Sequence, residues 1–250
     1  VRMPEQKVHA VVLRYANYKE SSRMLTLFTL EKGVLSVAAR GCRRAKSPIR
    51  AGCEILTFGE YMLHTNRDRH SLRDCTVLDA FFDLRKDLDR LSTAIHLRDL
   101  CEAVLAPEEP QGQTFSLLVR CLGLLCHEKL EPQVVQLFFE VQLMEEIGLM
   151  PQVEGCVLCG RPLGVETAFS ISQGGAVCRD CRGKAPDARK VLPGTLATLR
   201  QMRKLDAQTL PRLRVGEAVR GELDGLWRGY LAHHLERRFG AADFARRIRS

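Results

Sequence analysis

The sequence lacks any apolar run long enough to span a membrane. No stretch of its 250 residues approaches the roughly 18 consecutive apolar residues that a membrane-spanning helix needs. Residues 1–7 also lack the apolar core of a secretory signal peptide. We therefore expect a cytoplasmic protein with no membrane partner.

The sequence also lacks the motifs that carry common enzymatic chemistry. Residues 41–47 fail as a phosphate-binding loop, because that motif needs glycines where Arg40 and Ala45 stand. A nucleophile elbow and a paired-carboxylate motif are missing. The zinc-deaminase signature is absent too, since His127 and Glu128 are adjacent rather than spaced. We expect a protein that is not an enzyme.

The composition that remains is ordinary for a globular protein. Hydrophobic residues make up 45% of the chain and charged residues 27%. A chain of 250 residues suggests about two domains. The formal net charge of +8 permits a polyanionic partner but does not identify one.

The most specific motif consists of two C-x-x-C pairs separated by eighteen residues. Its members are Cys156, Cys159, Cys178 and Cys181. Pairs with this spacing are typical of a structural zinc ribbon. Between them, residues 168–172 alternate in polarity and Gly174-Gly175 can turn, which predicts a hairpin that brings the two pairs together.

Two alternatives to a metal site stay open for these cysteines: two disulfides, or four unrelated buried thiols. A reducing cytoplasm favours metal ligands over disulfides. Four thiolates fill a tetrahedral shell and leave no position for water or substrate. We therefore predict one structural Zn²⁺ per chain.

Residues 8–78 are rich in strand signals. The candidates, bounded by Gly, Asn and Asp, are residues 8–15, 24–29, 33–40, 54–64 and 71–78, with a bulge expected near Gly59. Five strands in about 70 residues fit an OB-type barrel, although a small sandwich stays open.

From about residue 79 the apolar residues recur at helical spacing. The expected helices cover residues 79–105, 114–129 and 132–148, and later ones open at Pro193 and cover 215–235. The cysteine segment interrupts this region and is too small to build its own core without a metal ion. We predict an α+β protein. Its parts are a five-stranded N-terminal barrel at residues 1–79, an α-helical domain at 80–150 and 187–250, and an inserted four-cysteine zinc ribbon at 151–186.

A second feature is the cationic stretch at residues 39–50, which contains no acid. It holds Arg40, Arg43, Arg44, Lys46 and Arg50. Because the stretch follows a strand candidate and leads into an expected loop, its side chains could reach a phosphate backbone without disturbing a core. The alternative is a solvated surface loop, which is the usual fate of a run of charges.

Two further sets of side chains could add to such a surface. Aromatic residues could stack on bases, and the candidates are Tyr15, Tyr18, Phe28, Phe58 and Tyr61. We expect Phe28 and Phe58 to be core residues instead. C-terminal cations stand at Arg237, Arg238, Arg246, Arg247 and Arg249. For these the favoured explanation is that they complement a helix dipole.

The N-terminal residues resemble a known family. The segments VVLRY at 11–15, YKESSRMLTLFT at 18–29 and KGVLSVAARG at 32–41, followed by Lys46 and Ser47, resemble the N-terminal domain of the bacterial recombination mediator RecO. The order of barrel, helices, C-x-x-C ribbon and helices also matches, so the resemblance spans nearly the whole chain. Some family members lack the cysteines, and the four here imply a zinc-bearing member.

The resemblance implies an OB-fold N-terminal domain that binds single- and double-stranded DNA. It implies strand annealing without nucleotide hydrolysis in the RecFOR pathway of DNA damage repair and recombination, and a cytoplasmic, nucleoid-associated location. It also implies work with RecR to load RecA onto DNA coated by single-stranded DNA-binding protein, whose acidic C-terminal tail would contact the helical domain. On this hypothesis the principal DNA contacts are Arg40, Arg43, Arg44 and Lys46, followed by Lys32 and Arg50.

Two other classes stay open. The first is a zinc-ribbon protein-interaction scaffold or transcription-type regulator that binds mainly protein and does not anneal DNA. The second is a zinc nuclease, which a closed thiolate shell and the lack of a carboxylate cluster disfavour. The mediator and the scaffold differ in whether the cationic stretch carries DNA affinity.

Overall fold

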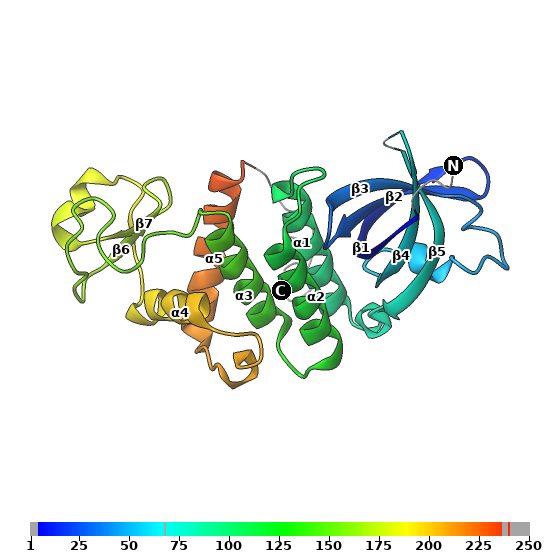
Figure 1. Cartoon of the computed structure of the whole chain (residues 1–250). Coiled ribbons are helices and arrows are strands. Elements are labelled where there is room, and N and C mark those ends of the chain that lie inside the picture. The colour runs from blue at the N-terminus through cyan, green and yellow to red at the C-terminus, as the bar shows by residue number, and fades with distance from the viewer. Residues whose placement is uncertain (1–4, 68, 237–239, 241–250) are drawn as a thin grey trace. The chain divides into compact units, whose positions relative to one another are not determined.

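The computed structural model describes residues 5–67, 69–236 and 240, which form two compact units (Figure 1). The first unit extends to Pro132, and the second runs from Gln133 to Gly240. None of the described helices combines the length and the apolar character needed to cross a membrane. The three-part domain boundaries drawn from the sequence stay a prediction.

The first unit begins with a closed five-stranded barrel. Its strands are β1 (Glu5–Tyr18), β2 (Ser22–Thr29), β3 (Gly33–Ala39), β4 (Phe58–Asn66) and β5 (Arg69–Asp79). The order around the barrel is β1-β2-β3-β5-β4, with β3 and β5 parallel and every other neighbouring pair antiparallel. This is an OB-like barrel, so the predicted barrel is confirmed and the sandwich alternative is wrong.

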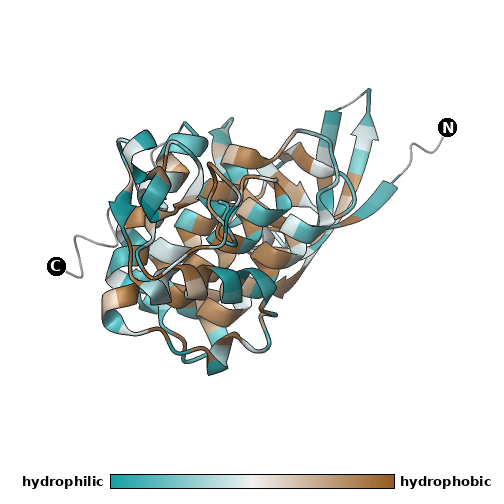
Figure 2. Ribbon diagram, turned by 90° about the vertical axis from the view of Figure 1, so that its left-hand side faces the viewer, coloured by the Kyte–Doolittle hydropathy of each residue, from teal (hydrophilic) through white to brown (hydrophobic). Residues whose placement is uncertain are grey.

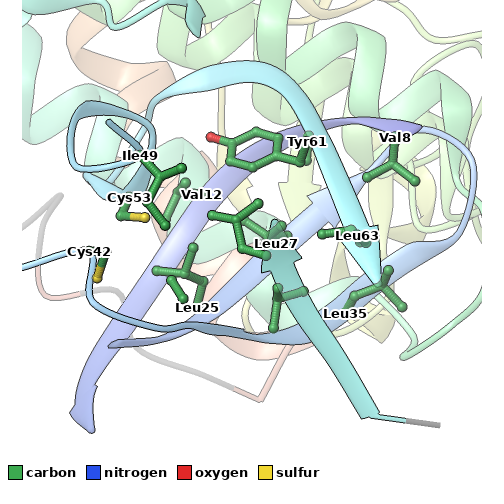
Figure 3. Packing of buried hydrophobic residues seen from close by; sticks show 14 residues of the cluster. Val8, Val12, Leu25, Leu27, Leu35, Cys42, Ile49, Cys53, Tyr61 and Leu63 are labelled. Carbon is green, nitrogen blue, oxygen red and sulfur yellow. The ribbon is translucent and has the colours of Figure 1, made fainter. Parts of the chain in front are cut away.

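Alternating side chains of the strands fill the barrel (Figure 3). The buried cluster comprises Val8, Ala10, Val12, Leu25, Leu27, Leu35, Val37, Ala39, Cys42, Ile49, Cys53, Tyr61, Leu63 and Leu72. Figure 3 shows Cys42, Ile49 and Cys53 at one end of this cluster. These three residues come from the β3–β4 connection, so that connection closes one end of the barrel.

Aromatic contacts attach a helix to the outside of the barrel. The helical part of the first unit consists of α1 (Leu88–Val104) and α2 (Gly112–His127). The ring of Phe115 in α2 meets Phe28 edge-on at 5.3 Å and Phe58 at 6.1 Å. Phe28 is fully buried, which confirms it as a core residue, whereas Phe58 is only partly buried.

The β4 strand differs from its prediction at one end and matches it at the bulge. The expected strand at 54–64 begins only at Phe58, because Ala51–Cys53 form a 3-10 turn and Leu56 has a positive φ of 68°. The predicted bulge is present, since the β4–β5 register shifts between Phe58 and Gly59. A Cβ atom on Gly59 would lie 2.5 Å from the Thr76 carbonyl oxygen, which explains the glycine.

Helix α1 also begins later than its periodicity predicts. The strand β5 continues to Asp79, and a 3-10 turn at Phe82–Lys86 follows before the helix opens at Leu88. The Asp87 carboxylate accepts hydrogen bonds from the N–H groups of Asp89 and Arg90 and so caps the first turn.

Gly33 stands where the α1–α2 connection meets β3. The N–H of Glu108 donates to the Val34 carbonyl at 3.3 Å, and Gly33 has a φ of +66°. A Cβ atom here would lie 2.2 Å from the Glu109 carbonyl oxygen. We predict that Gly33→Ala lowers the free energy of unfolding by about 2 to 4 kcal/mol, because left-handed strain and a backbone clash add.

Urea unfolding followed by circular dichroism measures this cost. The matched control is Gly41→Ala, which has a φ of +69° but meets nothing closer than 3.6 Å. The control should cost about 1 kcal/mol from strain alone. An equal cost for both substitutions would show that the contact with the α1–α2 connection is not tight.

Helices build much of the second unit within the residues that the structure describes. They are α3 (Pro132–Glu146), α4 (Pro193–Lys204) and α5 (Glu217–His234). The Gln142 amide of α3 donates to the Met202 carbonyl of α4 at 2.7 Å. The Tyr230 hydroxyl of α5 donates to the Leu149 carbonyl just after α3 at 2.9 Å. Both α4 and α5 are therefore tied to α3 or its C-terminal end.

The cysteine ribbon lies between α3 and α4 in the chain. Its strands β6 (Ala168–Ser170) and β7 (Gly175–Val177) form the predicted antiparallel hairpin. A third strand, β8 (Arg189–Lys190), pairs with β6 and was not predicted, because two residues carry no periodicity. The ring of His234 in α5 donates to the Ile171 carbonyl at 3.0 Å, which holds the hairpin against the helix.

Candidate metal centre and nucleic-acid interface

The four cysteines of the ribbon come together in the fold. Their sulfur atoms all lie within 4.8 Å of one another, and all four are free thiols. The Sγ atoms of Cys159 and Cys178 are 3.8 Å apart. Four Zn–S bonds of about 2.3 Å in a tetrahedron place sulfur atoms about 3.8 Å apart. The geometry fits one tetrahedral metal ion.

Tight backbone turns present the two pairs. The N–H of Gly160 donates to the Cys156 carbonyl at 2.8 Å, and Gly160 has the positive φ of 71° that suits a glycine. The N–H of Cys181 donates to the Cys178 carbonyl at 3.1 Å, within the 3-10 turn η3 (Arg179–Lys184). Each turn brings the sulfur atoms of its pair toward a common point.

The sulfur environment favours ionisation of one cysteine and opposes it at another. Burial works against a charged Cys156, but N–H groups of Cys178, Leu158 and Cys159 outweigh it and lower the pKa of this thiol to about 6. The sulfur atoms of Cys159 and Cys178 raise the pKa of Cys181 to about 12. Four thiolates this close repel one another, so full ionisation calls for a divalent cation.

The donor set indicates a structural site. All four donors are sulfur, three of the cysteines are buried, and Cys159 is exposed. Their apolar surroundings are Val177, Ala185, Val157, Leu163 and Ala188. This cluster is small, and a bound ion would add stability to the ribbon beyond its hydrophobic burial. Within the described ranges, no other group of three or more His, Cys, Asp or Glu side chains is placed to hold a metal.

The cationic stretch forms a connected series of turns after β3, and we call residues 40–50 the basic loop. Backbone N–H groups of Arg44, Ser47 and Arg50 each donate to a carbonyl three residues earlier, at 3.1, 3.0 and 3.3 Å. Gly41, at the first turn, has a φ of +69°. The basic loop is therefore held in a defined conformation by its own backbone hydrogen bonds.

Two kinds of contact anchor the basic loop to the barrel. Cys42 and Ile49 are buried in the barrel core, where Figure 3 shows them beside Cys53. The N–H of Arg43 donates to the Ser21 carbonyl in the β1–β2 turn at 3.0 Å. Apolar side chains of the loop thus point inward and leave its outer side to the cations.

The cations of the basic loop are exposed. They are Arg40, Arg43, Arg44, Lys46 and Arg50. The Arg43 guanidinium donates to the Glu20 carbonyl at 3.1 Å. Among the residues that the structure describes, none of the five has a carboxylate within ion-pair distance. Five unneutralised cations on one anchored loop suit a phosphate backbone.

Lys32 is not brought to the basic loop. It is exposed in the β2–β3 turn, where Thr29 pairs with Gly33, whereas the loop leaves the other end of the hairpin, where Arg23 pairs with Ala39. Six residues of strand separate these ends, about 20 Å. The C-terminal cations Arg237, Arg238, Arg246, Arg247 and Arg249 lie outside the described residues.

The aromatic residues that could stack on bases lie in different environments. Tyr61 is fully buried, and its hydroxyl donates to the Gly52 carbonyl at 2.8 Å, so the expectation that it could stack on a base is wrong. The ring of Tyr15 lies against the Arg23 guanidinium, whose carbon is 3.7 Å from the ring centroid. Tyr18 is exposed in the neighbourhood of the β1–β2 turn and stays a candidate for stacking.

One arginine next to the basic loop, Arg73, was missed from the sequence, as were two others on the same segment. Arg67, Arg69 and Arg73 are exposed on β5 and its preceding turn, and Figure 2 shows hydrophilic strand ends at that turn. The parallel β3–β5 pairing sets His70 beside Val37 and Ser71 beside Ala38, so Arg73 is level with the start of the basic loop. Arg67 and Arg69 lie farther back along β3, toward the β2–β3 turn. Arg73 stands at a β-bulge, which re-aims side chains. The even spacing of Arg67, Arg69 and Arg73 indicates that they share one face of a strand. The sequence near them does not show that this strand pairs in parallel with β3.

Family models and individual relatives agree on the family to which this sequence is similar. Residues 3–81 match the family model described as Recombination protein O N terminal, and residues 85–242 match Recombination protein O C terminal. The DNA repair protein RecO of Desulfitobacterium hafniense is 34% identical over 218 residues, covering 86% of this chain and 79% of the relative. That of Alkaliphilus metalliredigens is 30% identical over 243 residues, covering 97% and 99%. That of Acetivibrio thermocellus is 28% identical over 242 residues, covering 97% and 96%.

Proposed function

The chain belongs to the RecO family of DNA repair proteins, and from that premise we propose that it is a recombination mediator. In this role it binds single- and double-stranded DNA and anneals complementary strands. With RecR, it helps to load RecA onto DNA coated by single-stranded DNA-binding protein. The observation that supports this most is the basic loop, whose five exposed cations have no acidic partner among the described residues and are anchored on the barrel.

The annealing mechanism is electrostatic. Two complementary strands repel each other through their phosphates. Cations of the basic loop neutralise phosphates and release condensed counterions, which lowers this repulsion and leaves base pairing to drive the reaction. Arg40, Arg43, Arg44 and Lys46 are the principal contacts and Arg50 a further one, while Lys32 would act only on DNA that extends along the barrel. No bond is broken, so the function needs no catalytic residue and no nucleotide.

The zinc ion has a structural role in this proposal. One Zn²⁺ per chain would be held by Cys156, Cys159, Cys178 and Cys181. It supplies a tetrahedral cross-link between the two turns of the ribbon and no open coordination position. The helical part of the chain is then the proposed docking region for the acidic tail of the single-stranded DNA-binding protein.

Salt dependence of DNA binding tests the proposal. If roughly five cations contact a single strand, the logarithm of affinity should fall with the logarithm of salt at a slope of about −3 to −4. Fluorescence anisotropy of a labelled oligonucleotide, titrated at several salt concentrations, measures this slope. A slope near zero, or no binding at low salt, would favour the protein-binding scaffold instead.

A further inference from the structure

A second cationic surface lies on the ribbon, and we call Arg179, Arg182 and Lys190 the ribbon face. These three exposed side chains line a depression of about 20 Å³ together with Glu166, Thr167, Ala168, Val177 and the metal-ligand candidate Cys178. That volume admits one water molecule or one phosphate oxygen. The ribbon face belongs to the second compact unit, whereas the basic loop belongs to the first.

The fold gathers these cations from separate segments. Arg179 and Arg182 directly follow the metal-ligand candidates Cys178 and Cys181 in η3. Lys190 comes from β8, whose pairing with Ala168 places it at the same depression. The sulfur-bearing turn and the third strand together create the ribbon face, so its geometry depends on the folded ribbon.

The charge of the ribbon face is only partly neutralised. Glu166 lies 3.4 Å from Arg179 and 3.5 Å from Lys190, so one carboxylate serves two cations. Within the described part of the chain, Arg182 has no carboxylate within ion-pair distance. Asp187 is directed elsewhere, because its carboxylate accepts hydrogen bonds from Ser170 and from the Ser172 N–H. The face therefore keeps an excess of positive charge.

The positive charge of the ribbon face is not fully offset by the negative charge of the metal centre. A divalent ion with four thiolates carries a net negative charge, which nearby cations could offset. The side chain of Arg179, however, is 81% exposed and that of Lys190 is 62% exposed. Most of each side chain is therefore in contact with solvent, so both cations are accessible to a ligand.

We propose that the ribbon face binds a phosphate backbone and holds the second DNA strand during annealing, while the basic loop holds the first. This inference rests on the proposed DNA-binding function. A phosphate oxygen would enter the depression and receive hydrogen bonds from the two guanidinium groups and the ammonium group. Glu166 competes with the phosphate for Arg179 and Lys190 and so limits affinity.

The test uses the full-length, zinc-loaded protein with Arg179, Arg182 and Lys190 replaced by alanine. A charge-matched control replaces Lys204, Arg212 and Arg214, which are exposed in the same unit but outside the ribbon. Zinc content per chain checks that the ribbon stays folded. Fluorescence anisotropy measures the affinity for a first labelled strand. For the second site, the protein is bound to an immobilised strand, and the amount of a second, non-complementary labelled strand that it captures is measured.

The ribbon-face variant should bind the first strand within about threefold of the control and capture the second strand about tenfold less. Equal capture by variant and control would overturn the inference. Glu166→Gln provides an independent test that leaves every cation in place. It should raise second-strand capture about threefold, and an unchanged or lower capture would count against the ribbon face. If the wild type binds no first strand, the proposed function itself fails, which is a distinguishable result.

Discussion

Replacing Arg40, Arg43, Arg44 and Lys46 by alanine should lower the affinity for single-stranded DNA by about a hundredfold at about 0.1 M salt. Each lost phosphate contact removes about 0.7 from the magnitude of the salt slope, so four contacts should flatten it by about 3. The effect is large because these side chains are exposed and, among the described residues, have no carboxylate to occupy them. The loop should keep its conformation, since Cys42 and Ile49 anchor it.

A charge-matched variant separates specific contacts from a change in net charge. Lys7, Lys86, Lys129 and Lys204 are exposed lysines outside the basic loop. Replacing these four by alanine removes the same formal charge and should change affinity by less than about fivefold at about 0.1 M salt. Anisotropy titrations of both variants at several salt concentrations measure the difference. Equal losses would mean that DNA responds to overall charge rather than to the basic loop.

Serine at any one of Cys156, Cys159, Cys178 or Cys181 should abolish stoichiometric zinc binding and unfold the ribbon. Structural zinc sites carry apparent binding free energies of about 10 to 16 kcal/mol at pH 7, which exceeds what so small an apolar cluster can supply. Metal content per chain and protease sensitivity of residues 151–190 measure the two effects. We expect less than about a tenth of the zinc and rapid cleavage.

Cys126→Ser is the control for the zinc prediction. Cys126 lies on α2 in the first unit, away in sequence from the four ligands, and should retain one zinc per chain and an intact ribbon. Binding of a first DNA strand should survive in the ligand variants, because the basic loop belongs to the other unit. A soluble variant lacking all four cysteines that anneals DNA fully would show that the ion is dispensable.

Local sequence patterns predicted much of the fold. Alternating apolar residues located all five barrel strands, and Gly59 marked a real bulge. The ribbon hairpin followed from alternation and the glycines at 174 and 175. Spacing alone identified the cysteines, because two C-x-x-C turns on one hairpin have few ways to meet. Each of these features depends on residues within one segment of the chain, so the sequence displays it directly.

Features that depend on pairing between distant segments were missed. Lys32 is close in sequence to Arg40, but the hairpin places the two at opposite ends. Tyr61 looked available for stacking, yet the β3–β4 connection covers it and accepts its hydroxyl hydrogen bond. The position of Arg73 depends on the pairing of β5 with β3, and the ribbon face depends on the pairing of β8 with β6. Neither pairing can be recognised from the local sequence. In each case tertiary pairing, rather than local preference, decides the position.

Annealing of complementary oligonucleotides without nucleotide is the decisive measurement of the proposed mediator function. Fluorescence quenching between labelled strands follows the rate for the wild type, for the basic-loop variant and for the four-lysine control. We expect the wild type and the control to accelerate annealing and the basic-loop variant not to accelerate it. A wild type that fails to anneal, or a basic-loop variant that anneals as fast as the control, would contradict the proposed mediator function.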